Sequence, residues 1–161
     1  MKEVTVISGS KKGFTASYAD KHCRLEYTGW MSRKADIYIG DELYTVAPTS
    51  FFSSSADVLK NGRPVLQLRM NWKGDTKISA SKESGRFYTF KHKGFFTSGF
   101  MITDDKGTEL IWVESKFKWS KFNSNYTISA SESFHYEGNE LLVMVAVYCA
   151  NYYASMQVAV L

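Results

Sequence analysis

The stretch that decides the fold of this chain is Leu141-Leu142-Val143-Met144-Val145-Ala146-Val147-Tyr148-Cys149-Ala150. It is apolar on every side of a helical wheel, and no charged residue occurs from 141 to 161. A helix that is hydrophobic all round has to be surrounded. Just ahead, Asn139 can cap the helix and Glu140 puts an acid at the positive end of the helix dipole. We therefore expect a helix over about 139–154 and a closing strand over 155–161.

Two other interpretations of this segment remain open. A transmembrane helix needs about 20 apolar residues, but Asn151, Ser155 and Gln157 would then lie in hydrocarbon, and no basic residue flanks either end. A pair of buried strands is the other interpretation, because valine is abundant. We adopt the helix enclosed by protein, which requires the preceding chain to close around it.

Short strand signals recur along the rest of the chain. They cover residues 2–7, 24–30, 35–39, 43–46, 65–70, 76–80, 87–91, 100–103, 109–114 and 126–131. Between several of them stand turn sequences, namely Gly40-Asp41, Asn61-Gly62 and residues 104–107, and each predicts a hairpin. Asn61-Gly62 is the most specific, because the pair suits a type I′ turn. The spacing predicts an antiparallel meander.

The size and composition of the chain suit one domain. With 161 residues, 44% of them hydrophobic, it can bury one sizeable core but is short for two. We therefore predict a single domain over 1–161, a mainly β protein in which a closed antiparallel β-barrel encloses one C-terminal hydrophobic α-helix. No signal peptide is evident at the N-terminus, so we expect a cytoplasmic protein.

Four segments carry a resemblance to a known family. They are residues 40–46, residues 57–68 with their glycine-containing turn, residues 100–107 and the apolar residues 141–153. In their order and hydrophobic pattern they resemble the tubby C-terminal-like superfamily, which includes the tubby proteins, the phospholipid scramblases and the plant LURP-one-related proteins. The resemblance implies a barrel of a dozen or so strands around a hydrophobic helix near the C-terminus.

The chain also departs from those families. It has no proline-rich or cysteine-rich arm before the barrel, and no calcium-ligand cluster of the scramblase kind. Scrambling activity and tubby-like transcriptional roles are therefore not carried over. No functional residue of the families matches a position of this chain.

The residues that most often carry catalysis are scattered. His22, His92 and His135 lack the i+3 or i+4 partners of a helical metal pair. Cys23 follows His22, but adjacent residues on a strand point to opposite faces, so we expect a buried thiol beside an exposed imidazole. Cys149 lies in the apolar run, and we expect both thiols to be reduced core residues.

Other catalytic signatures are missing as well. Asp104-Asp105 precedes Lys106-Gly107, a pattern typical of a turn in which an aspartate caps its own backbone. The sequence contains no nucleophile elbow, no dinucleotide fingerprint and no phosphate-binding loop of the Walker type. These observations favour a protein that is not an enzyme and has neither a metal nor a cofactor.

The candidate binding surface combines cations with aromatic residues. In an extended segment, Lys116 and Lys118 share one face while Phe117, Trp119 and Lys121 share the other. Cations on an earlier strand can extend the same positive surface. The full candidate set for lipid or anion binding is Arg86, Lys91, Lys93, Lys116, Lys118, Lys121 and Trp119.

Such a surface suits anionic lipid head groups, with shallow insertion of aromatics at a bilayer interface. We therefore hypothesise a non-catalytic binding or scaffold domain that contacts anionic phospholipid and is peripheral to a membrane, or else binds a protein partner. Three alternatives stay open: a small-ligand-binding barrel or enzyme with a site at the barrel mouth, a binder of single-stranded nucleic acid, and an ordinary strand whose lysines protect a sheet edge.

Overall fold

The computed structural model describes residues 3–8, 13–18, 21–28, 33–49, 55–71, 75–80, 85–93, 99–118 and 123–160. These residues form twelve β-strands and one α-helix. The strands are β1 (Glu3–Ser8), β2 (Gly13–Tyr18), β3 (Lys21–Tyr27), β4 (Ala35–Ile39), β5 (Glu42–Pro48), β6 (Ser55–Lys60), β7 (Arg63–Met70), β8 (Thr76–Ala80), β9 (Phe87–His92), β10 (Gly99–Thr103), β11 (Glu109–Lys118) and β12 (Asn123–Ala130). The helix is α1 (Glu140–Val160).

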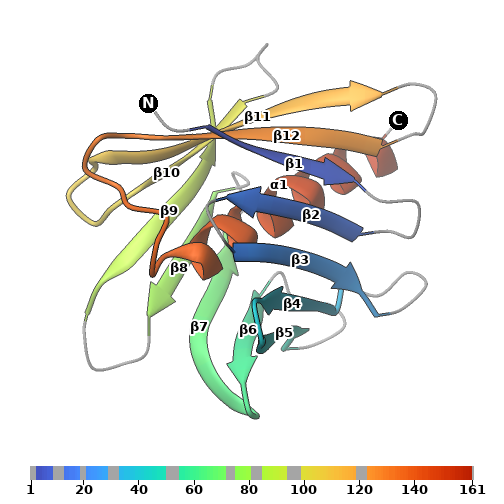
Figure 1. Cartoon of the computed structure of the whole chain (residues 1–161), viewed down its shortest axis with the longest axis vertical. Helices are drawn as coiled ribbons and strands as arrows, with labels where there is room; N and C mark the ends of the chain where they lie inside the picture. The colour runs from blue at the N-terminus through green and yellow to red at the C-terminus, as the bar shows by residue number, and fades with distance from the viewer. Residues whose placement is uncertain are drawn as a thin grey trace.

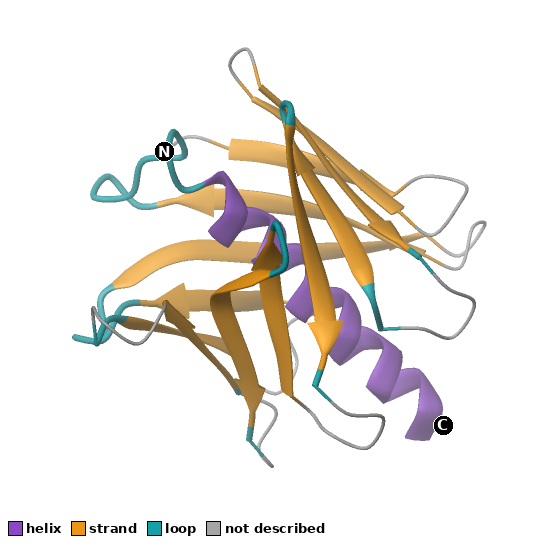
Figure 2. Ribbon diagram, turned by 90° about the horizontal axis from the view of Figure 1, so that it is seen from below, coloured by secondary structure: helices purple, strands orange, loops and turns teal. Residues whose placement is uncertain are grey.

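The strands form a closed antiparallel barrel. Each strand pairs with its neighbours in sequence, and β1 pairs with β12 to complete the ring, from Glu3 opposite Ser129 to Val6 opposite Tyr126. Figure 1 shows the strands curving around α1, and Figure 2 shows the helix running between the walls of the barrel. The predicted fold class, a closed antiparallel barrel with one C-terminal hydrophobic helix, is confirmed.

Successive side chains of a strand point alternately into and out of the barrel, and the inward-pointing ones line the core. On β4, Ala35, Ile37 and Ile39 are buried, whereas Asp36 and Tyr38 between them are only half-buried. The same period of two repeats around the barrel, so every strand turns one apolar row towards α1. The barrel interior is therefore a packed hydrophobic core.

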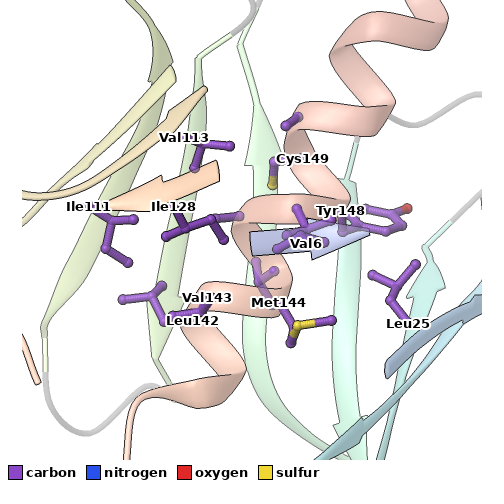
Figure 3. Packing of buried hydrophobic residues seen from close by; sticks show 14 of the residues in the cluster. Val6, Leu25, Ile111, Val113, Ile128, Leu142, Val143, Met144, Tyr148 and Cys149 are labelled. Carbon is purple, nitrogen blue, oxygen red and sulfur yellow. The ribbon is translucent and has the colours of Figure 1, made fainter. Parts of the chain in front are cut away.

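The helix fills that interior. Every residue from 142 to 150 is at most 6% exposed, on all sides of the helix. In Figure 3, Met144 and Tyr148 of α1 lie among strand residues that include Val6, Leu25 and Ile128. Full burial of one such aliphatic side chain contributes roughly 1.5–3 kcal/mol. Enclosure in the barrel thus explains how this uncharged segment is kept away from water.

The C-terminal end of α1 differs from the expectation. The predicted helix over 139–154 is present, but the predicted closing strand over 155–161 is wrong, because α1 continues to Val160. The physical reason is that β1 already pairs with β12, so the barrel needs no further strand, and the segment contains no glycine or proline to stop the helix. Within the described residues, no helix has both the length and the hydropathy that a membrane crossing requires.

The N-terminal end of α1 lies where the sequence predicts it. Asn139 directly precedes the helix, and its carbonyl oxygen accepts the first helical hydrogen bond from the backbone N of Val143 at 3.3 Å. The side chain of Asn139 acts outside the helix, since its Nδ2 donates to the carbonyl oxygen of His135 at 2.9 Å. Asn139 therefore ties the start of α1 to the loop that follows β12.

All three predicted hairpins are confirmed, between β4 and β5, β6 and β7, and β10 and β11. The turn at Asn61-Gly62 has φ angles of 53° and 77°. Positive φ at both central residues is the requirement of a type I′ turn, and asparagine and glycine tolerate it best. The pairing of Lys60 with Arg63 next to the turn thus follows from local turn chemistry, whereas the register shifts by one residue between Val58 and Leu59.

Two strands, β2 and β6, were not predicted from the sequence pattern. β2 contains glycine, alanine and serine, which have weak strand propensity, although Phe14 and Ala16 of that strand are buried on alternate positions. β6 is absent from the strands that periodicity predicts, although it lies within the resembling segment 57–68 apart from its first two residues. Tertiary pairing with strands on both sides stabilises each of them.

Candidate functional site

Three of the predicted cations lie on or beside β9. Lys91 is half-buried in the strand, and Lys93 is exposed just after it, where its backbone N donates to the carbonyl oxygen of Gly99 at 2.8 Å. Arg86 is exposed before the strand begins, and its carbonyl oxygen accepts from the backbone N of Ala80 at 3.3 Å. Strand alternation groups Lys91 with Lys93, whereas Arg86 stands at the other end of β9.

The second group of predicted residues lies at the end of β11. The backbones of Lys116 and Lys118 are in the strand, where they pair with Asn125 and Asn123 of β12. Their side chains are not among the described parts of the chain, and Trp119 and Lys121 lie outside the described residues. The extended conformation expected for the start of the basic-aromatic row is therefore confirmed as far as Lys118.

The strand register brings the apolar side chain of Met101 next to Lys91, with Trp112 one strand further on. Lys91 lies opposite Met101 of β10, and Met101 lies opposite Trp112 of β11. Met101 faces outward, because its neighbours Phe100 and Ile102 belong to the interior core and it does not, yet it is only 9% exposed. Lys91 therefore has an apolar neighbour on the outer face of the barrel. The methylene groups of its side chain can pack against that apolar surface while its ammonium group stays in water.

An acidic residue interrupts this surface. Glu114 is exposed on β11 and lies opposite Gly99 of β10, whose backbone carbonyl binds the N–H of Lys93. A second acid, Glu109, accepts a hydrogen bond from Nε1 of Trp112 at 3.1 Å. The positive charge near β9 is consequently not continuous across β11.

Sequence reasoning missed one pair of cations that the strand register brings together. Arg69 of β7 lies directly opposite Lys77 of β8, and both side chains are exposed. The signal that could have found them is the density of charge along the chain. Residues 63 to 93 contain eight Lys or Arg and only two Asp or Glu.

The three histidines lie apart. Nδ1 of His22 is 2.9 Å from Oγ of Ser17, across the β2–β3 pair. His92 stacks on Tyr153 of α1, with ring centroids 5.2 Å apart, and His135 is exposed in the loop before the helix. Among the described residues, no group of three or more His, Cys, Asp or Glu could hold a metal ion.

Both cysteines are free thiols in the core, as predicted. Cys23 is buried beside the exposed His22, which confirms the expected opposite faces. Burial raises the pKa of the Cys149 thiol to about 12, and it also raises the pKa of Cys23. A thiol is a nucleophile only when it is deprotonated, so neither cysteine is activated.

The turn at Asp104 behaves as its sequence indicates. Oδ1 of Asp104 accepts from the backbone N of Lys106 at 2.9 Å and from that of Thr108 at 2.8 Å. These hydrogen bonds stabilise the carboxylate and lower the pKa of Asp104. The Asp104 carboxylate thus stabilises the β10–β11 turn, which confirms the prediction that Asp104-Asp105 belongs to a turn.

One small cavity adjoins the helix inside the barrel. It has a volume of about 20 Å³, which is room for about one water molecule. Its walls include Cys149 and the hydroxyl-bearing Thr76 and Tyr148. Oγ1 of Thr76 is buried in this wall, beside the Cys149 thiol.

A larger groove lies between the β4–β5 and β6–β7 hairpins. Its volume is about 310 Å³, at the lower limit of small-molecule sites. Its walls are Lys34, Leu43, Thr45, Ala47, Leu59, Asn61 and Gly62. Oγ1 of Thr45 donates to Oδ1 of Asp36 at 3.0 Å. None of the three histidines lines this groove or the inner cavity.

Comparison with known proteins yields no relative for this chain. No protein-family model matches the sequence, no curated protein matches it, and no solved structure matches it.

Proposed function

We propose that this protein is a non-catalytic binding domain of the tubby-like type, which contacts anionic phospholipid head groups through its outer surface. The tubby-like assignment is supported by the order of elements, a complete meander of strands followed by an enclosed apolar helix. The observation that carries the functional proposal is that the interior of the barrel is filled, which leaves only its outer surface for binding. α1 occupies the interior, so binding has to use the outside of the barrel.

The surface we propose consists of Arg86, Lys91, Lys93, Lys116, Lys118, Lys121 and Trp119. Support comes from the arrangement around Lys91, which lies opposite the buried Met101, and Met101 in turn lies opposite the half-buried Trp112. Basic residues near an anionic bilayer contribute roughly 1 kcal/mol each, and tryptophan suits the polar interface of a membrane. Several such residues acting together would give weak, salt-sensitive attachment.

A barrel-mouth ligand site receives less support. Carriers of small ligands leave the barrel interior open, whereas here the inner cavity holds about one water. A single-stranded nucleic-acid binder remains an outcome of the test, because stacked bases and lysine–phosphate contacts would use the same surface.

Co-sedimentation with liposomes tests the proposal. Vesicles of phosphatidylcholine alone are compared with vesicles that also contain 20–30 mol% of an anionic phospholipid, an amount of roughly the density at which surface potentials become strong. We expect binding only to the anionic vesicles, and a loss of most of it between 0.1 and 0.5 M salt, over which the screening length shrinks to about half.

The variant K91Q/K93Q is expected to weaken binding at least fivefold. The control K60Q/K106Q removes the same charge from the end of β6 and from the β10–β11 turn, and is expected to change binding less than twofold. Equal binding to neutral and anionic vesicles, or binding to neither, would refute the proposal. Tighter binding to single-stranded oligonucleotides than to vesicles would favour the nucleic-acid alternative.

A further inference from the structure

The β7–β8 pair contains two like charges in direct opposition. Arg69 of β7 and Lys77 of β8 are paired residues in the antiparallel register, so their Cβ atoms are neighbours on one face. Both are exposed, and they lie on the outer face because the alternate residues Leu68 and Ile78 are buried in the core. Like charges directly opposite one another destabilise a sheet.

No acidic side chain offsets this pair in the part of the chain that the structure describes. The three ion pairs found there join Lys21 to Glu140, Arg24 to Glu26 and Lys60 to Glu42. The acids on adjoining strand positions are Asp57, which lies opposite Gln67, and Asp75, which precedes β8. Neither of them is within ion-pair distance of Arg69 or Lys77.

The stretch of sequence that contains this pair is strongly basic. Residues 63 to 93, which contain β7, β8 and β9, carry a formal charge of +6, with eight basic and two acidic residues. The rest of the chain has twelve basic and fourteen acidic residues and is therefore slightly negative. A stretch with this excess of positive charge attracts anions.

Neighbouring side chains add features that suit a phosphate group. Nζ of Lys77 lies 4.5 Å from the centre of the Phe87 ring on β9, which holds the ammonium group over an aromatic face. Thr89 lies opposite Lys77 and contributes a hydroxyl to the same row. The guanidinium of Arg69 can bind two phosphate oxygens at once, while the ammonium of Lys77 acts as a point charge.

We infer that Arg69 and Lys77 together bind a phosphate monoester. A monoester carries between one and a half and two negative charges near neutral pH, by analogy with phosphorylated side chains. Two adjacent cations match that charge, whereas a phosphodiester carries only one. The inference deepens the proposed function and rests on it: within an anionic bilayer, the lipid preferred is one with a terminal phosphate.

Vesicles of matched surface charge separate this preference from general attraction. One set contains phosphatidic acid, which has a phosphate monoester, and the other contains phosphatidylglycerol, a diester, with the amounts adjusted to equal electrophoretic mobility. We expect the wild-type protein to bind the phosphatidic acid vesicles at least fivefold more tightly. A separate arm titrates soluble glycerol 3-phosphate by NMR, which distinguishes a free phosphate ligand from a membrane lipid.

The decisive variant is R69Q/K77Q, which keeps side-chain length and removes both charges. Each basic residue near an anionic surface accounts for about a fivefold change in partition, so the pair is expected to account for about 30-fold. The control R24Q/K106Q loses the same two residue types elsewhere on the barrel and should change binding less than twofold. R69K keeps the charge but loses the paired donors of the guanidinium, so its affinity for phosphatidic acid should lie between those of the wild-type protein and R69Q/K77Q.

The outcomes of these arms are distinct. Equal binding of the wild-type protein to both sets of matched vesicles overturns the phosphate inference and leaves the lipid proposal standing. An equal loss in R69Q/K77Q and in its control overturns the assignment of the two residues. Absence of binding to any anionic vesicle refutes the proposed function itself, and binding of glycerol 3-phosphate without vesicle binding identifies a soluble ligand for the same pair.

Discussion

Nζ of Lys21 lies 2.6 Å from Oε1 of Glu140, so an ion pair joins the first residue of β3 to the first residue of α1. The two partners are unequal, because the Lys21 side chain is 47% exposed whereas that of Glu140 is 6% exposed. The carboxylate also stands in the first turn of the helix, where the helix dipole favours negative charge. This contact fixes where the core helix enters the barrel.

The unequal burial predicts unequal effects of substitution. Lys21→Met leaves a buried carboxylate without its cation and is expected to cost about 2 kcal/mol, since breaking a buried pair from one side is the expensive change. Glu140→Gln leaves only an exposed ammonium and is expected to cost about 1 kcal/mol, the value of a typical hydrogen bond. Urea unfolding measures both. Lys60→Met, in the exposed pair with Glu42, is the control and should be nearly neutral.

Met144 tests whether the helix is enclosed. It is fully buried in the second turn of α1, so Met144→Ala should lower the free energy of unfolding by about 2–5 kcal/mol through lost burial and an unfilled cavity. Met144→Leu keeps the volume and should cost less than about 1.5 kcal/mol. Denaturation of both variants under the same conditions gives the comparison. Similar small losses for both would mean that the helix is not packed in a barrel.

Stability should fall steeply at alkaline pH. Burial raises the pKa of Cys149 from 9.0 to about 12, and it raises the pKa of Tyr27 and of Tyr136 from 10.0 to about 12. Above pH 9 the unfolded chain therefore releases protons that the folded protein keeps, and the stability present below pH 9 is lost as the pH rises towards 12. Thermal unfolding midpoints at intervals between pH 8 and 12 measure the decline.

The variant Cys149→Ala isolates one group in that decline. It should be less stable at pH 8, because of lost packing, but its stability should fall less steeply with pH by the contribution of one proton. In the wild-type protein, Cys149 should react with a thiol reagent at pH 8 only on unfolding. An unchanged slope in the variant, or rapid labelling of the native protein at Cys149, contradicts the burial of this thiol.

The turn at Asn61-Gly62 offers a local test. Asn61 has a φ angle of 53°, a conformation in which a β-branched side chain is strained. Asn61→Val is therefore expected to cost about 1–2 kcal/mol, whereas Asn61→Gly should change the stability by less than about 0.5 kcal/mol. Chemical denaturation distinguishes them. Equal stabilities would show that the hairpin does not need a left-handed residue at this position.

Much of the fold could be predicted from local patterns. The apolar run at 141–150 predicts an enclosed helix because a helix with no polar face cannot meet water. Turn residues such as Asn61 and Gly62 act over a few positions and therefore mark their hairpins. β2 lacked such a signal, because its small residues become a strand only when β1 and β3 supply hydrogen bonds on both sides.

The candidate site was less accessible from the sequence. Alternation along one strand correctly groups Lys91 with Lys93, since a strand has a fixed period of two. The neighbour of Lys91, by contrast, is Met101 of β10, and the opposition of Arg69 and Lys77 likewise comes from the pairing of two different strands. Contacts of this kind depend on register, which a single strand does not contain.

By itself, the sequence determined that the apolar C-terminal segment forms a buried helix, that strands surround this helix, and that tight turns join several of the strands. These features follow from burial and from backbone conformation at individual residues, which are local properties. Only the tertiary structure decided that β1 meets β12, that α1 runs on to Val160, and that Arg69 faces Lys77. Those outcomes depend on how twelve strands close into one ring around the helix, because closure sets which residues on neighbouring strands become opposite partners.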